Sequence, residues 1–174
     1  RGSWKFINKV WTIINENKNL FETKIETTEI KSKKYNEIKK ITHKILKDVT
    51  NNIESFQMNV AVAKIYELTN FISTFRPENN NDKDALKESI EILVRILEPM
   101  IPHLAEECWS IIGGNDLLCK QPWPIFDAQY IQDDMIQIVI QVNGKKKAVL
   151  EIENDSEQDK IIEKLKNIEN IQVV

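Results

Sequence analysis

Apolar residues in the first part of the chain recur at the spacing of an amphipathic helix. The first such segment steps by three and four residues along one helix face, and polar sequence over 15–19 ends it. Its apolar stripe consists of Trp4, Ile7, Trp11 and Ile14. The pattern predicts a first helix with both tryptophans packed in the core.

The same period continues through two longer segments. A second helix is predicted from about Ser32 to Ile53, and a third from about Gln57 to Phe75. Apolar residues of the third segment spread around most of its circumference, which predicts a central helix covered by its neighbours. The inward stripe of the second helix consists of Ile38, Ile41, Ile45 and Val49.

A fourth and a fifth helix complete the predicted bundle. The polar loop 77–82 precedes the fourth helix, which Asp82 or Asp84 would cap. Pro102 fits the first turn of the fifth helix, because the N–H that proline lacks would be unpaired there anyway. The glycine pair at 113–114 ends this helix. The buried stripe of the fourth helix consists of Leu86, Ile90, Leu93 and Leu97.

The period changes after a connector at 115–134. Residues 136–142 alternate in polarity, as in a strand that has one face buried. A three-residue hairpin loop at 142–144 would keep the apolar residues of both strands on one side of the hairpin. This register pairs Ile138 with Ala148 and Ile136 with Leu150.

The whole pattern predicts a mainly α protein. A five-helix bundle would occupy residues 1–114, the connector 115–134, and a small truncated α/β domain 135–174. After the hairpin we expect a helix from Asp155 or Ser156 and another strand over 171–174.

Composition favours an ordinary soluble protein. The chain has 174 residues, 41% of them apolar, and a net charge of −3. Basic residues gather in the N-terminal third, whereas 151–169 is mainly acidic, so any surface for a polyanion must be local. Apolar runs are too short for a membrane span, which makes the cytoplasm the default location. The chain opens on Arg1 and leads directly into a helix, so we expect a piece of a larger protein.

Two cysteines are the only metal-binding thiols to consider. Cys108 and Cys119 have no second cysteine pair and no histidine cluster nearby to complete a zinc site. We therefore expect two reduced thiols and no bound metal.

Several stretches resemble motifs of one enzyme family. Phe56–Ala63 resembles the third-helix motif of class I synthetase anticodon domains, and Leu97–Trp109 resembles a motif shared by the leucine, isoleucine and valine enzymes. Gln121–Pro124 followed by Ile140–Lys145 is similar to the connector and strand of leucyl-tRNA synthetases, and Phe6–Trp11 resembles the opening helix of their bundle. The chain thus resembles the C-terminal part of a bacterial-type leucyl-tRNA synthetase.

This resemblance implies a tRNA-binding part of a ligase whose chemistry lies elsewhere. In the family, upstream domains ligate leucine to tRNA(Leu) using ATP and magnesium, so no cofactor and no catalytic residue is expected in this chain. The expected partners are tRNA(Leu) and the enzyme's own catalytic domain, in a monomer. The run 31–34 resembles the family's lysine-serine signature, but that signature precedes the bundle, whereas this run follows the first helix.

Lysines are the candidate tRNA-binding residues. Contacts along an A-form stem are dominated by phosphate and shape, and a lysine neutralises a phosphate without reading sequence. The second helix carries lysines at steps of four and three on its outer face. The hairpin carries three lysines in succession, and the third of them, Lys147, stands where the family has an arginine. The candidates are Lys5, Lys9, Lys40, Lys44, Lys47, Lys145, Lys146 and Lys147.

Each candidate has a structural alternative. The lysine stripe could be a solvated helix face, and His103 favours packing or hydrogen bonding over acid–base chemistry. Trp4, Trp11 and Trp109 favour the core over base stacking, and Trp123 is expected to pin the connector to the bundle. For the whole chain, the alternatives are a structural or protein-interaction bundle, which the net charge of −3 favours, and the equivalent domain of a valine, isoleucine or methionine synthetase.

Overall fold

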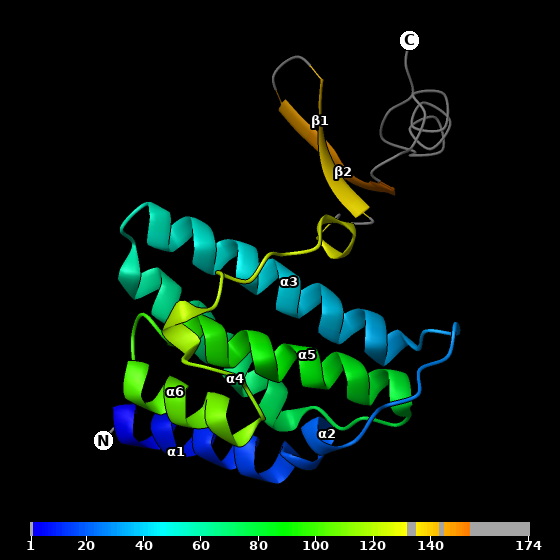
Figure 1. Ribbon diagram of the computed structural model, residues 1–174. Coiled ribbons are helices and arrows are strands. Elements are labelled where there is room, and N and C mark those ends of the chain that lie inside the picture. Colours follow the sequence, from blue (N-terminus) through cyan, green and yellow to red (C-terminus); the bar gives the residue numbers. More distant parts are fainter. Residues whose placement is uncertain (1, 132–134, 143–144, 154–174) are drawn as a thin grey trace. The chain divides into compact units, whose positions relative to one another are not determined.

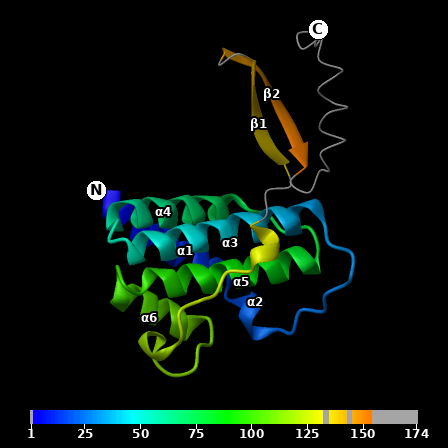
Figure 2. The same cartoon turned by 90° about the horizontal axis from the view of Figure 1, so that it is seen from above.

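The computed structural model describes residues 2–131, 135–142 and 145–153, the last two ranges through their backbone only. The chain divides into two compact units, 1–131 and 132–174, and we describe each by itself. The first unit is helical (Figures 1 and 2). Its elements are α1 (Gly2–Asn17), α2 (Asn19–Glu22), α3 (Lys33–Glu54), α4 (Met58–Thr74), α5 (Asn80–Leu97), α6 (Pro102–Ile111) and the short 3-10 turns η1 (Leu118–Lys120) and η2 (Ala128–Tyr130).

The predicted mainly α bundle is confirmed, and α1, α3, α4, α5 and α6 are its five predicted helices. Pro102 opens α6 as expected, and Gly113 adopts a left-handed φ of 82° just after the helix. A Cβ at Gly114 would overlap the Trp109 ring, so the Gly114 backbone packs directly against that indole. No helix among the described residues is long and apolar enough to cross a membrane.

The Asp82 side chain links the starts of α3 and α5. Asn79 caps α5 by accepting from the Asp82 N–H at 2.9 Å, so the prediction of Asp82 or Asp84 as the cap is wrong. Asp82 lies instead in the first turn of α5, where it is fully buried. Its carboxylate accepts from the Ser32 hydroxyl and from the Glu78 N–H, and Ser32 itself caps α3.

The central helix is α5, not α4 as predicted. Helix α5 packs against α2, α3, α4 and α6. Its buried positions lie around much of its circumference, and Leu86, Leu93 and Leu97 are among them. On α4, by contrast, Val60 and Val62 are each 37% exposed. Although apolar residues lie on all sides of α4, other helices cover only part of its surface.

Helix α1 buries a different face from the predicted one. Trp4 is 69% exposed and Trp11 is 40% exposed, whereas the predicted stripe required both in the core. The buried stripe is Phe6, Val10, Ile13 and Ile14. The predicted stripe and the observed stripe share Ile14. The observed stripe is the one that packs against α4, where the Phe6 ring stacks on Tyr66 with 4.0 Å between ring centroids.

The second unit contains an antiparallel hairpin of β1 (Met135–Val142) and β2 (Lys145–Glu153). Val142 pairs with Lys145, and a bulge then shifts the register between Ile140 and Gln141. The predicted register is therefore wrong by two residues, although apolar residues still lie opposite one another, because the bulge does what the longer loop was expected to do. Beyond the bulge the pairs include Ile140 with Ala148, Ile138 with Leu150 and Ile136 with Ile152. The predicted helix from 155 and the strand at 171–174 lie outside the described residues.

Candidate functional site

Three of the candidate lysines lie on the outer side of α3. Lys44 is exposed, and Lys40 and Lys47 are half-buried, while the opposite side of the helix faces α4 and α5. This is the predicted spacing of a basic face. We call Lys40, Lys44 and Lys47 the α3 lysine face.

The other candidates are not part of this face. Lys5 and Lys9 are exposed on α1, and Lys9 Nζ donates to Asn70 Oδ1 of α4 at 2.8 Å. Helix α4 packs against both α1 and α3, so α1 does not extend the α3 lysine face directly. Lys145, Lys146 and Lys147 begin β2, and their side chains lie outside the described residues.

Lys64 of α4 forms ion pairs with two acidic residues, one of them on α3. Lys64 Nζ lies 3.3 Å from Asp48 Oδ2 and 3.1 Å from Glu67 Oε2. The hydrogen bond to Glu67, followed by the contact with Asp48, raises the pKa of Lys64. These pairs are solvent-accessible and contribute little to stability, but they reduce the positive potential that a phosphate would meet.

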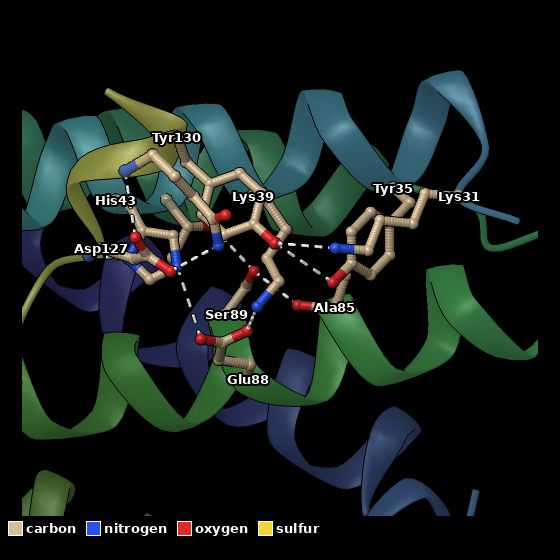
Figure 3. Close-up of polar contacts among 11 residues, drawn as sticks. Lys31, Tyr35, Lys39, His43, Ala85, Glu88, Ser89, Asp127 and Tyr130 are labelled. Carbon is tan, nitrogen blue, oxygen red and sulfur yellow. Dashed lines mark hydrogen bonds and ion pairs between the residues drawn. The ribbon is translucent and has the colours of Figure 1, made fainter. Parts of the chain in front are cut away.

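A polar cluster that the sequence analysis missed lies on the inner side of α3 (Figure 3). Lys39 is only 9% exposed, and its ammonium group pairs with Glu88 of α5. Burial alone would raise the pKa of Glu88, but the contacts with His43 and Lys39 lower it below its usual value. One turn along, the Thr42 and Ser89 hydroxyls are 2.7 Å apart. Polar groups thus join α3 to α5.

His43 connects this cluster to the end of the connector. Its ring is 3% exposed, and Nδ1 accepts the backbone N–H of Asp127 at 3.1 Å. The acceptor role of Nδ1 places the proton of the neutral ring on Nε2, which lies 3.4 Å from Glu88 Oε1. That separation gives an electrostatic contact, since the Nε2 geometry does not meet that of a directed hydrogen bond.

Tyr130 of η2 covers the cluster from the outside (Figure 3). Its ring stacks on His43, with 5.2 Å between centroids and 12° between planes, and Lys39 Nζ lies 5.2 Å from the Tyr130 centroid. The Tyr130 hydroxyl lies 3.4 Å from that of Tyr35 and 3.5 Å from Lys31 Nζ. Burial and the Tyr130 hydroxyl raise the pKa of Tyr35 well above its usual value, so the Tyr35 phenol stays neutral.

The rest of the connector is also fastened to the bundle. Trp123 donates from Nε1 to Thr50 Oγ1 at 2.9 Å, which confirms that this residue pins the connector. Arg95 donates to the Pro122 carbonyl oxygen. The Glu106 carboxylate accepts the N–H groups that begin η1, and these bonds lower its pKa.

Four other residues have sequence-based predictions: His103, Trp109, Cys108 and Cys119. His103 is predicted to pack or to form a hydrogen bond, and its exposure in the first turn of α6 contradicts the packing alternative. Trp109 packs against the core as predicted. Both cysteines are free, and burial raises the pKa of Cys108 to about 12. Among the described residues, no group of three or more His, Cys, Asp or Glu side chains could hold a metal ion.

Sequence alone held one signal for the missed cluster. Tyr35, Lys39 and His43 follow one another at four-residue steps on the inward side of α3, beside the apolar stripe. Titratable residues at such positions need buried partners, because an unpaired buried charge is costly. The partners, Glu88 and Tyr130, are 49 and 87 residues from Lys39 and His43 respectively, so spacing did not identify them.

Comparison with known proteins places the chain in a family. Residues 36–164 match the model of the anticodon-binding domain of tRNA ligase. This match covers more than half of the chain, and the chain therefore belongs to that family.

Similar proteins are leucine–tRNA ligases. The one from Mesorhizobium japonicum is 36% identical over 163 residues, which cover 90% of this chain and 18% of the relative. The one from Ehrlichia ruminantium is 39% identical over 158 residues, covering 91% of this chain and 19% of the relative. The chain thus spans about a fifth of the length of these curated relatives.

A solved structure shares the fold. The ternary complex of Agrobacterium radiobacter K84 agnB2 LeuRS with tRNA and LeuAMS matches with a TM-score of 0.78 at 24% identity. The match covers 97% of this chain and 22% of that chain. At this level of identity the match establishes the fold only.

Proposed function

We propose that the chain is the tRNA-binding part of a leucine–tRNA ligase, whose whole polypeptide ligates leucine to tRNA(Leu) using ATP and magnesium in the cytoplasm. The observation that carries this proposal is the α3 lysine face, which lies inside the segment that matches the anticodon-binding family. The leucine–tRNA ligases among the relatives support the choice of amino acid.

The proposed contact is electrostatic. Lysines spaced along one helix neutralise successive phosphates and release counterions, without distinguishing one base from another. The A-form stem of a tRNA hides its major-groove edges, so a surface of this kind fits its backbone. Lys145, Lys146 and Lys147 extend the proposal to the second unit, and Lys5 and Lys9 to α1.

The test is the salt dependence of tRNA binding. A Lys40→Ala, Lys44→Ala, Lys47→Ala triple variant should lose affinity and flatten the plot of log affinity against log salt by about one unit per phosphate contact removed. A matched control removes the same charge from exposed lysines outside α3: Lys18→Ala, Lys24→Ala, Lys83→Ala. An equal change in both variants would reduce the effect to net charge. An unchanged slope in the first variant would support a structural bundle, in keeping with the net charge of −3.

We also propose that the exposed tryptophans of α1 pack against the catalytic part of a monomeric enzyme. Trp4 is 69% exposed and Trp11 is 40% exposed on one side of α1. Large apolar groups exposed together mark an interaction surface, and the relatives are about five times longer than this chain. In the whole enzyme, Trp4→Ser with Trp11→Ser should lower the midpoint of thermal unfolding, whereas in the 174-residue chain it should not. Equal effects in both would contradict a docking role.

A further inference from the structure

The end of the connector covers a charged cluster that needs it. Lys39 and Glu88 form an ion pair between α3 and α5, and Lys39 is only 9% exposed. Tyr130 closes the outer side of this pair, with its ring 5.2 Å from Lys39 Nζ and stacked on His43. Removing the connector would expose the Lys39 ammonium group to water, and the Asp127 N–H would lose its acceptor, His43 Nδ1.

These contacts fix the chain to the bundle just before the first unit ends. Tyr130 precedes Ile131, the last residue of the first unit. Only residues 132–134 separate Ile131 from Met135, where β1 begins. Four peptide steps extend at most about 14 Å.

Loss of the Tyr130 contacts would lengthen this path. Phe126 is the preceding apolar residue that packs against the core, so release would free residues 127–131. The path from Phe126 to Met135 has nine peptide steps, which extend at most about 32 Å. The number of residues in the link would grow from three (132–134) to eight (127–134).

We propose that His43 and Tyr130 are positioning residues: they clamp the connector to the bundle and thereby keep the link to the hairpin unit short. This proposal rests on the proposed function, because its benefit is to binding. When the α3 lysine face and the hairpin unit engage one tRNA, the second contact is intramolecular. For a link long enough to span the two contacts, its effective concentration falls as about the −3/2 power of link length. Lengthening the link from three to eight residues should weaken tRNA binding about fourfold.

The clamp itself is tested without RNA, by hydrogen exchange on the full chain. Tyr130→Ala should accelerate exchange of the amides over 127–131, including the Asp127 N–H, and leave α4 unchanged. Tyr130→Phe is the matched control, because it keeps the ring over His43 and Lys39 and loses only the long hydroxyl contacts of 3.4 and 3.5 Å. His43→Phe keeps a ring but removes the acceptor for Asp127, and should accelerate exchange of that amide. Unchanged exchange in Tyr130→Ala would overturn the clamp.

The role in positioning is tested by tRNA binding with an insertion that imitates release. Five Gly/Ser residues placed after Ile131 give the same eight-residue link while leaving every clamp contact in place. The insertion and Tyr130→Ala should each weaken binding about fourfold, and Tyr130→Ala should add less than twofold to the insertion. Exposed Ile125→Ala is the control on the connector and should change neither exchange nor binding.

The outcomes separate the two proposals. Faster exchange with unchanged binding in both Tyr130→Ala and the insertion variant would overturn the positioning role and leave the proposed function standing. If Tyr130→Ala binds tRNA more weakly but the insertion variant binds with unchanged affinity, the positioning role would also be overturned, because link length would then not matter. If the unaltered chain shows no salt-dependent tRNA binding, the proposed function fails, and the positioning role fails with it, whatever the exchange data say of the clamp.

Discussion

Two helix–helix contacts in the bundle are built from different chemistry. The buried part of the contact of α1 with α4 is apolar, with Phe6 stacked on Tyr66, and the hydrogen bond from Lys9 to Asn70 lies at its exposed edge. Ile13 and Ile14 belong to the same buried stripe of α1. The contact of α3 with α5 contains matched polar groups, such as Lys39 with Glu88. Apolar faces pack in several alignments, whereas a buried donor must meet its own acceptor. The apolar contact therefore supplies stability, while the polar contact fixes the alignment of α3 on α5.

The largest expected effect lies at the apolar contact. Ile14→Ala should lower the free energy of unfolding by about 3 kcal/mol, because a fully buried side chain leaves a cavity. Trp4→Ala, at a 69% exposed position, should cost less than about 1 kcal/mol in the same urea titration. Equal losses would show that α1 buries the tryptophan stripe after all.

The polar contact should show an asymmetry between its partners. Glu88→Gln leaves the buried ammonium of Lys39 without its counter-charge and should cost about 2 kcal/mol. Lys39→Met should cost less, because the Glu88 side chain is 35% exposed and water can solvate its carboxylate. Urea unfolding of both variants and of the double variant measures the coupling. A larger loss for Lys39→Met would contradict this account.

A smaller effect is expected one turn along α3. Thr42→Val keeps the shape of the side chain but removes the 2.7 Å hydroxyl contact with Ser89, and should cost about 1 kcal/mol. Ser89 still donates to the Ala85 carbonyl, which limits the loss. Thr12→Val, on the exposed side of α1, is the control and should be neutral within about 0.5 kcal/mol.

The smallest effect is a change in acid sensitivity. Since the folded-state pKa of Glu88 lies below its unfolded value, its contribution is fully present above the unfolded pKa and is lost as pH falls through the folded one. The unaltered chain should therefore lose more stability between pH 7 and about pH 4 than Glu88→Gln does. Urea titrations at the two pH values give the difference, and parallel losses would remove Glu88 from the acid response.

The sequence predicted what depends on local spacing. Helix positions, the Pro102 start of α6 and the anchoring role of Trp123 all follow from period and local residue chemistry. It failed where a choice depends on distant partners. The Trp4 stripe and the Phe6 stripe satisfy the same helical period, and the choice between them depends on the helices that pack against α1, including the Tyr66 ring of α4 that stacks on Phe6. Likewise, no residue near His43 in the sequence indicates that Tyr130 stacks on its ring.

The shared carboxylate of Asp82 has a consequence for folding kinetics. It accepts from the Ser32 hydroxyl at the start of α3 while lying in the first turn of α5, fifty positions later in the chain. Asn81 beside it holds the segment just before α3 by accepting the Thr28 N–H and donating to the Ile30 carbonyl. Closing a loop of this length costs entropy before any contact compensates for it. The first turns of α3 and α5 are therefore expected to form in one cooperative step, with Asp82 variants slowing folding more than they speed unfolding.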